Sequence, residues 1–130
     1  MTDTTSSRRL LIAEDNEINQ IVVSRMLDLL GVEHDIVANG AECLAALKTR
    51  DYAMILMDIS MPVLDGLRAT EKIRQGGSPN AGIAVFAMTA NTGPEERAAF
   101  IRAGFNGVLA KPFTRAELTE LLAGVLPPNG

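Results

Sequence analysis

The feature that most constrains this chain is an alternation of short apolar runs with longer helical patterns, repeated five times. Short apolar runs separated by helical segments predict parallel strands joined by crossover helices. A parallel pair cannot be closed by a tight turn, so each helical segment has to return the chain to the same end of the sheet. The predicted strands are RLLIA at 9–13, HDIVA at 34–38, YAMILM at 52–57, IAVFAM at 83–88 and NGVLA at 106–110.

The segments between these runs carry helix start and stop signals. Pro94 suits a first helical position, and Thr114 suits a cap because Glu117 follows three residues later. Gly31 and Gly104 suit helix ends. These signals predict an α/β fold of five βα units, a doubly wound parallel sheet with helices on both faces. The predicted helices cover 17–30, 40–50, 65–75, 94–103 and 114–126.

Length and composition place the chain in a broad class. Its 130 residues suit one domain, which we expect at 8–126, between a flexible polar leader at 1–7 and a flexible tail at 127–130. The 12 basic and 16 acidic residues give a net charge of −4 and leave no basic patch for nucleic acid on this chain alone.

Cysteine content and hydropathy narrow the class further. The single cysteine, Cys43, excludes an internal disulfide and suits a small apolar position on a helix in a reducing compartment. No apolar run approaches the roughly 18 residues of a membrane span. We therefore expect a cytoplasmic domain, either free or as the cytoplasmic part of a larger membrane-bound protein.

Chemically useful side chains follow four of the five predicted strands. Glu14 and Asp15 follow the first, Asp58 the third, Thr89 the fourth and Lys111 the fifth. Ligands of such folds bind beyond the carboxyl ends of the strands, all of which meet at one edge of the sheet. The five side chains are therefore expected to converge.

This set suits a site that forms an aspartyl phosphate. Three clustered carboxylates repel one another unless a cation neutralises them, and oxygen ligands with open positions suit Mg²⁺. Lys111 offers a charge for a phosphoryl oxygen, Thr89 offers a hydroxyl donor, and a metal ion would screen Asp58 against an incoming anion. Each residue alone is explained as readily by a helix cap, a turn or a solvated surface charge. Their joint placement favours the functional interpretation.

Four motifs in this order resemble the receiver domain of two-component response regulators, particularly the receivers attached to hybrid histidine kinases. The resemblance covers residues 8–126 and implies a flavodoxin-like fold with strand order 2-1-3-4-5. The motifs are AEDNEINQ, LMDISMPVLDG, AMTA and LAKPF.

The resemblance assigns a role to each acidic residue. Asp58 would accept a phosphoryl group from a phosphohistidine of a histidine kinase or histidine phosphotransfer domain. Glu14, Asp15 and Asp58, with the backbone carbonyl of Ser60, would bind Mg²⁺. A domain of this kind catalyses only its own phosphorylation and dephosphorylation within a phosphorelay.

The resemblance also assigns the remaining strand ends. Thr89 would be the switch hydroxyl, and Lys111 would pair with the phosphoryl group. A cis bond between Lys111 and Pro112 is implied, which would aim the lysine inward. Ser60 and Asn91 offer no carboxylate to orient attacking water, so we expect a phosphoryl group of moderate lifetime.

One position departs from the family pattern. An aromatic residue usually stands three positions before the lysine, where this chain has Val108. That difference argues against a switch by ring rotation, and we expect Phe86, Phe105 and Phe113 to pack in the core. The signal would then pass through Thr89 and the loop at 89–93.

The first predicted helix carries two apolar stripes. We expect the larger one to face the sheet and the smaller one either to pack on a neighbouring helix or to form a docking face. The second alternative is favoured, with a helical phosphodonor as the partner. The larger stripe is Ile18, Ile21, Val22, Met26 and Leu29, and the smaller one is Val23, Leu27 and Leu30.

Other interpretations of the same residues are less consistent with the sequence. A phosphatase of the haloacid dehalogenase type needs a second aspartate where Ser60 stands, and a flavodoxin loop would not place Glu14 and Asp15 against a phosphate. His34 has no companion at metal-ligand spacing and is given no role. A phosphorylation-independent interaction module on the same fold remains the alternative, supported by Val108 alone.

Overall fold

The computed structural model describes residues 8–76 and 79–126 and confirms the α/β prediction. Its five parallel strands form one sheet in the order β2-β1-β3-β4-β5, as the resemblance implies. The proposed leader at 1–7 and tail at 127–130 lie outside the described residues. The strands are β1 (Leu10–Ala13), β2 (His34–Val37), β3 (Met54–Asp58), β4 (Ala84–Thr89) and β5 (Gly107–Ala110).

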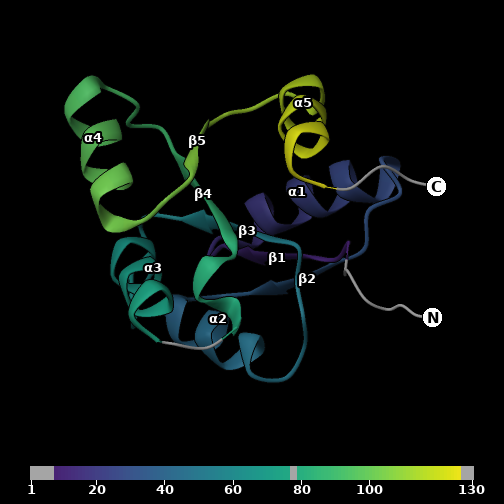
Figure 1. Cartoon of the computed structure of the whole chain (residues 1–130). Coiled ribbons are helices and arrows are strands. Elements are labelled where there is room, and N and C mark those ends of the chain that lie inside the picture. The colour runs from purple at the N-terminus through teal and green to yellow at the C-terminus, as the bar shows by residue number, and fades with distance from the viewer. Residues whose placement is uncertain (1–7, 77–78, 127–130) are drawn as a thin grey trace.

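Five α-helices follow the strands, and α2, α3 and α4 lie across the sheet from α1 and α5 (Figure 1). The second helix ends at Leu47 instead of at residue 50, and a short 3-10 helix that the sequence did not predict, η1 (Pro79–Gly82), precedes β4. None of the helices in the described part of the chain is both long and apolar enough to span a membrane. The helices are α1 (Glu17–Leu29), α2 (Gly40–Leu47), α3 (Gly66–Gln75), α4 (Pro94–Ala103) and α5 (Arg115–Val125).

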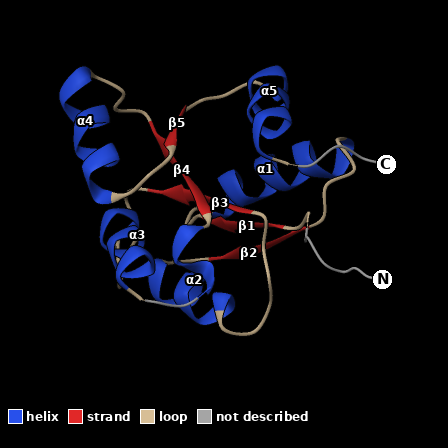
Figure 2. Ribbon diagram, viewed as in Figure 1, coloured by secondary structure: helices blue, strands red, loops and turns tan. Residues whose placement is uncertain are grey.

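Helices cover both faces of the sheet (Figure 2). Alternate residues of the central strands supply two separate cores. On β3, Ile55 and Met57 pack on the face covered by α2, α3 and α4, whereas Met54 and Leu56 pack under α1 and α5. This alternation follows from the two-residue period of a strand. Because both faces are covered, β3 is buried along its whole length and its final residue, Asp58, is carried to the edge of the sheet.

The helix ends follow the local sequence signals. Asn16, Asn39 and Asp65 accept a hydrogen bond from the backbone N–H three residues later and so begin α1, α2 and α3. The predicted Thr114–Glu117 capping box begins α5. Pro94 is the first residue of α4, and the helix stops at Gly104 with φ of 109°.

The orientation predicted for α1 is wrong. The smaller stripe faces the sheet, with Val23 and Leu27 buried in the core beneath α1 and α5. Four residues of the larger stripe lie on the outside, where the side chain of Ile18 is 71% exposed, and Met26 packs against the core. Contacts of Val23 and Leu27 with the core residues of β1 and α5 select this rotation, and Gln20 Nε2 donates a hydrogen bond to the Glu14 carbonyl at 2.6 Å. The spacing of apolar residues along the helix shows two apolar stripes but carries no information on these contacts.

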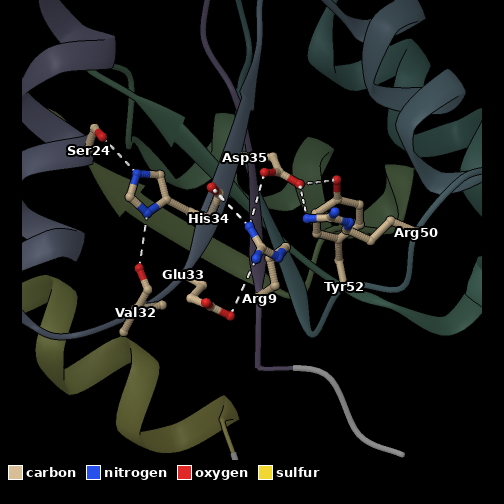
Figure 3. A network of polar contacts seen from close by, with 8 residues as sticks. All are labelled: Arg9, Ser24, Val32, Glu33, His34, Asp35, Arg50 and Tyr52. Carbon is tan, nitrogen blue, oxygen red and sulfur yellow. Dashed lines mark hydrogen bonds and ion pairs between the residues drawn. The ribbon is translucent and has the colours of Figure 1, made fainter. Parts of the chain in front are cut away.

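A polar network ties together the strands at their amino-terminal ends (Figure 3). Asp35 on β2 accepts hydrogen bonds from Tyr52 Oη at 2.6 Å, Arg9 Nη1 at 3.1 Å and Arg50 Nη1 at 3.3 Å. Arg9 also forms an ion pair with Glu33 at 3.4 Å. The network links residues next to β1 and β3 to the edge strand β2.

His34 connects β2 to α1 on the other side of the same strand (Figure 3). Its Nδ1–H donates to the carbonyl of Val32 at 3.0 Å, which in the neutral ring leaves Nε2 to accept from the Ser24 hydroxyl at 2.7 Å. Both ring nitrogens are therefore satisfied by structural contacts, and His34 lies at the end of the sheet opposite the acidic residues, beside Leu10.

Candidate functional site

The carboxyl ends of four strands bring the predicted side chains to one edge of the sheet. Asp58 ends β3 and pairs with Met88, so Thr89 follows directly on the neighbouring strand. The N–H of Lys111 donates to the Thr89 carbonyl at 2.9 Å, and the N–H of Glu14 continues the ladder to Val37 at 3.0 Å. Strand register thus places the last residues of β3 and β4 beside the residues that follow β1 and β5.

Three carboxylates gather at this edge. Oxygen atoms of Glu14, Asp15 and Asp58 lie within 4.8 Å of one another, with Glu14 and Asp58 buried and Asp15 exposed. Lys111 Nζ lies 2.7 Å from Glu14 Oε1 and 3.5 Å from Asp58 Oδ1. The lysine therefore contacts both buried acids from the β5 side of the site.

The pKa values of the two buried carboxyl groups are shifted in opposite directions. Burial and the neighbouring negative charge of Glu14 raise the pKa of Asp58 to about 6, against the opposing effect of Lys111. Burial acts in the same direction on Glu14, but the hydrogen bonds from Lys111 and the Asn16 N–H outweigh it and lower its pKa. The lysine charge is thus committed mainly to Glu14, and Asp58 lacks full compensation.

Two polar residues that the sequence interpretation did not assign, the cap residue Asn16 and Gln20 of α1, support Glu14. The N–H of Asn16 donates to Glu14 Oε2 at 3.1 Å, and Gln20 Nε2 donates to the Glu14 backbone carbonyl. Both residues belong to the AEDNEINQ motif. The Asn16 contact uses the backbone and leaves no signal in the residue type, whereas Gln20 is marked only by its polar side chain one turn into α1.

The donor set fits a divalent cation. Beside the three carboxylates, Ser60 stands two residues after Asp58, and its N–H donates to Asp58 Oδ1 at 3.3 Å. One lysine cannot neutralise three acids, and hard oxygen ligands on one exposed and two buried residues leave positions open to water or a phosphate. The chemistry of the cluster is therefore that of a cation site able to receive an anion.

Comparison with known families decides what kind of domain carries this site. The profile of the response regulator receiver domain matches residues 10–123. The chain belongs to this family. The resemblance read from the four sequence motifs is confirmed, and the described structure is that of a receiver domain in two-component signalling.

Known receiver domains match it closely in sequence and shape. The receiver domain of sensor histidine kinase PA1611 from Pseudomonas aeruginosa PAO1, solved with magnesium in its active site cleft, is 38% identical with a TM-score of 0.84, over 92% of this chain and 98% of that one. The Ssk1 receiver domain of Saccharomyces cerevisiae, solved with the histidine phosphotransfer protein Ypd1, is 26% identical with a TM-score of 0.85, over 95% and 91% of the two chains.

A full-length relative shows how such domains are embedded. Histidine kinase 5 of Arabidopsis thaliana is 36% identical to the receiver domain over 91% of this chain. The chain spans 16% of the length of that kinase.

The remaining strand ends of the receiver domain are placed as follows. Thr89 is buried, and its Oγ1 accepts a hydrogen bond from the N–H of Asn91 at 3.0 Å. The peptide bond between Lys111 and Pro112 is cis, as the resemblance implies. The threonine hydroxyl is therefore bonded to the start of the loop that leads into α4.

Val108 of the receiver domain packs on the core beneath α2, α3 and α4. Phe86 and Phe113 pack on the opposite core, and Phe105 is buried in an edge-to-face contact with Phe100 at 5.7 Å between ring centroids. The prediction that these phenylalanines serve core packing is confirmed. None of these three rings occupies the place that the family gives to a mobile aromatic residue.

Proposed function

We propose that Asp58 is the phosphoacceptor of this receiver domain and takes its phosphoryl group from a phosphohistidine. The observation that supports this role best is the convergence of Glu14, Asp15 and Asp58 within 4.8 Å, with Lys111 beside them. Of the two buried carboxylates, Asp58 is the less compensated, because Lys111 and Asn16 hold Glu14 more closely. It therefore has an oxygen free to attack an electrophile.

The transfer needs little covalent chemistry from the protein. The phosphorus–nitrogen bond of the donor breaks, a phosphorus–oxygen bond to Asp58 forms, and the imidazole leaves with the electron pair. Catalysis of such a step consists mainly of positioning and charge stabilisation. Lys111 Nζ, 3.5 Å from Asp58 Oδ1, is placed to pair with an oxygen of the incoming group.

We propose Glu14, Asp15 and Asp58, with the backbone carbonyl of Ser60, as the residues that hold Mg²⁺. When bound, Mg²⁺ would supply the positive charge that screens Asp58 from an anionic phosphoryl group. An adjacent cation also lowers the pKa of Asp58 from its raised value of about 6, so the nucleophile is ionised at neutral pH.

The phosphoryl group is expected to persist for a moderate time. Ser60 and Asn91 flank the site two residues after Asp58 and Thr89, and neither can orient water as a carboxylate does. The domain would then catalyse its own dephosphorylation at a moderate rate and no reaction on other substrates.

We propose that the partner docks on α1 beside the site. Ile21 and Val22 are 54% and 46% exposed there, next to Ile18. Val22 also lines a cavity of about 350 Å³ together with Pro112 and Phe113, and Glu14 and Lys111 form its wall toward the site. An apolar helix face that adjoins the acceptor suits a helical histidine phosphotransfer domain or kinase helix. The Ssk1 receiver domain was solved with a partner of that class.

For the output, we propose a path through Thr89 and the loop at 89–93. A phosphoryl oxygen that accepted a hydrogen bond from the Thr89 hydroxyl would draw Oγ1 toward Asp58, and the Asn91 N–H that donates to Oγ1 would transmit this displacement to the start of the loop. Relatives such as histidine kinase 5 of Arabidopsis thaliana are much longer than this chain. We therefore propose that the domain acts in a cytoplasmic phosphorelay, either as part of a hybrid kinase or as a separate partner of one.

Intact-mass spectrometry after incubation with acetyl phosphate tests the acceptor. The wild-type chain should gain one phosphoryl group in Mg²⁺ and none in EDTA, and Asp58→Asn should gain none. Asp51→Asn is the matched control, because Asp51 is exposed and precedes the other end of β3. It should behave as the wild type.

Two results would contradict the proposal. An adduct that survives in Asp58→Asn would move the acceptor to another residue. No adduct in the wild-type chain at short reaction times, with a phosphorylated histidine phosphotransfer protein as an additional donor, would favour the phosphorylation-independent interaction module.

A further inference from the structure

The loop between β3 and α3, residues 59–65, carries Ser60 and follows a tightly constrained path. The Gly66 N–H donates to the Ile59 carbonyl at 3.1 Å, and the Leu64 N–H donates to the Pro62 carbonyl at 2.7 Å. The second bond spans only two residues and closes a γ-turn around Val63, whose φ is 69°. The loop is thus folded back on itself immediately after the acceptor.

Val63 is an unusual residue for this conformation. It is the one non-glycine residue with positive φ in the described ranges 8–76 and 79–126, and it is β-branched. β-Branched residues avoid the left-handed region because their side chains crowd the backbone. The side chain is 81% exposed, so burial of Val63 does not compensate for the strain. Contacts elsewhere must hold the loop in this shape.

The amino terminus of α2 provides the main contact of this kind. The side chain of Asn39 caps the helix through the Glu42 N–H, which leaves the first helical N–H, that of Gly40, without an acceptor inside the helix. Gly40 donates this N–H to the Leu64 carbonyl at 2.9 Å. The start of α2 is therefore hydrogen-bonded to the loop that carries Ser60.

Only a residue without a side chain allows this approach. A Cβ atom at Gly40 would overlap the carbonyl oxygen of Leu64 and lie 2.9 Å from Ala69 Cβ on α3. Gly40 does not have a positive φ, so space is the reason for glycine here. A Cβ at Gly66 would likewise overlap the Asp58 carbonyl oxygen, which pins the far end of the same loop.

We propose that Gly40 is a positioning residue for the metal site, acting through Leu64 on the loop that presents Ser60. The inference rests on the proposed function in one respect, that Ser60 contributes its carbonyl to Mg²⁺. Close backbone contacts hold both ends of the loop, and the ring of Pro62 fixes its φ. The reversal of the chain therefore falls on the backbone of Val63, which adopts a φ of 69°. The strained γ-turn is the consequence of the contact with α2.

Titration calorimetry with Mg²⁺ tests the positioning role without any phosphoryl transfer. Gly40→Ala should raise the dissociation constant for Mg²⁺ about tenfold or more, because changes to the residues that support metal ligands commonly weaken metal binding by this much. Gly124→Ala on α5 is the matched control, because a Cβ there meets no atom within 4 Å, and its dissociation constant should stay within about twofold of wild type.

The calorimetric titration separates positioning from folding. A reversible folding defect would raise the apparent dissociation constant only by the reciprocal of the folded fraction, which circular dichroism measures on the same sample. A rise no larger than that factor would overturn the positioning role. Absence of Mg²⁺ binding by the wild-type chain would instead overturn the metal site itself, and with it any role in positioning that site.

A second variant tests the strained turn even if Gly40→Ala does not fold. Val63→Gly should raise the melting temperature, because glycine adopts a φ near 69° without strain, and should leave Mg²⁺ affinity unchanged. Glycine in an unstrained loop lowers stability through the entropy of the unfolded chain. A lower melting temperature for Val63→Gly would therefore show that α2 does not impose strain on this loop.

Discussion

At the scale of single residues, the site holds Asp58 in a state that the folded protein disfavours. Burial and the charge of Glu14 raise the pKa of Asp58 to about 6, above its ordinary value of 3.8. Between these two pH values the folded chain binds more protons at this position than the unfolded chain does. The free energy of unfolding therefore falls as pH rises through this window, and the full penalty applies above about pH 6.

Asp58→Asn should stabilise the metal-free protein at neutral pH. In EDTA, the variant should exceed the wild type in free energy of unfolding by roughly 1–3 kcal/mol at pH 7, and the difference should shrink toward pH 4. Urea unfolding followed by circular dichroism at several pH values measures it. Asp51→Asn, at an exposed position, should show no such trend. A difference that does not change with pH would contradict the assignment.

At the scale of elements, α1 combines a core-facing stripe with an apolar surface beside the acidic cluster. Val22→Asp would place a charge in the proposed docking face, next to the cavity lined by Pro112 and Phe113. Phosphotransfer from a phosphorylated histidine phosphotransfer protein should fall at least about tenfold in kcat/KM, because a buried unpaired charge in an interface is strongly unfavourable. Phosphorylation by acetyl phosphate should not change, since a small donor needs no docking face.

The matched control for α1 lies on the other side of the sheet. Ile101 on α4 is 56% exposed, so Ile101→Asp makes the same chemical change on a helix that we do not assign to docking. It should retain phosphotransfer from the protein donor. Equal losses in the two variants would point to a general effect of surface charge, and a loss only in Ile101→Asp would place the docking face on α4.

The network at the amino-terminal ends of the strands makes a separate contribution to stability. The Tyr52 hydroxyl is the main cause of the lowered pKa of Asp35, with Arg9 and Arg50 adding to it against the effect of burial. A lowered pKa stabilises the fold above the ordinary value of 3.8, and this stabilisation is lost as pH falls through the folded-state pKa.

Tyr52→Phe removes that hydroxyl and little else. It should raise the pKa of Asp35 toward its ordinary value and lower the free energy of unfolding at pH 7 by about 1 kcal/mol, with a smaller difference at pH 3. Carboxyl-carbon NMR titration and urea unfolding measure the two effects. An unchanged titration of Asp35 would show that the arginines alone set its pKa.

Elements also differ in how far the sequence determines them. The caps at Asn16, Asp65 and Thr114 are local, so the helix starts follow from neighbouring residues. The rotation of α1 is not local, because Val23 and Val22 are equally apolar and only contacts with β1 and α5 select the buried one. A stripe count on one helix cannot resolve that choice, which explains the wrong prediction for α1.

At the scale of the whole molecule, parallel topology explains why the site could be predicted. Once the strands are parallel, residues that follow them must share an edge, so Glu14, Asp58 and Lys111 converge without knowledge of any side-chain contact. The contact of Gly40 with Leu64 and the φ of Val63 depend on packing between distant elements. Such features leave no periodic trace in the sequence and become visible only in the assembled fold.

The same topology links Mg²⁺ binding to the stability of the entire domain. The proposed ligands follow β1 and β3, whose residues supply both cores, so an ion that requires all of them together binds only the folded chain. At an Mg²⁺ concentration about 100 times the dissociation constant, the free energy of unfolding should rise by roughly 2.7 kcal/mol. Thermal unfolding across an Mg²⁺ series should show the rise in the wild type and in Asp51→Asn. Asp58→Asn should show a much smaller one, because it lacks a ligand, and an equal rise in that variant would place the ion elsewhere on the protein.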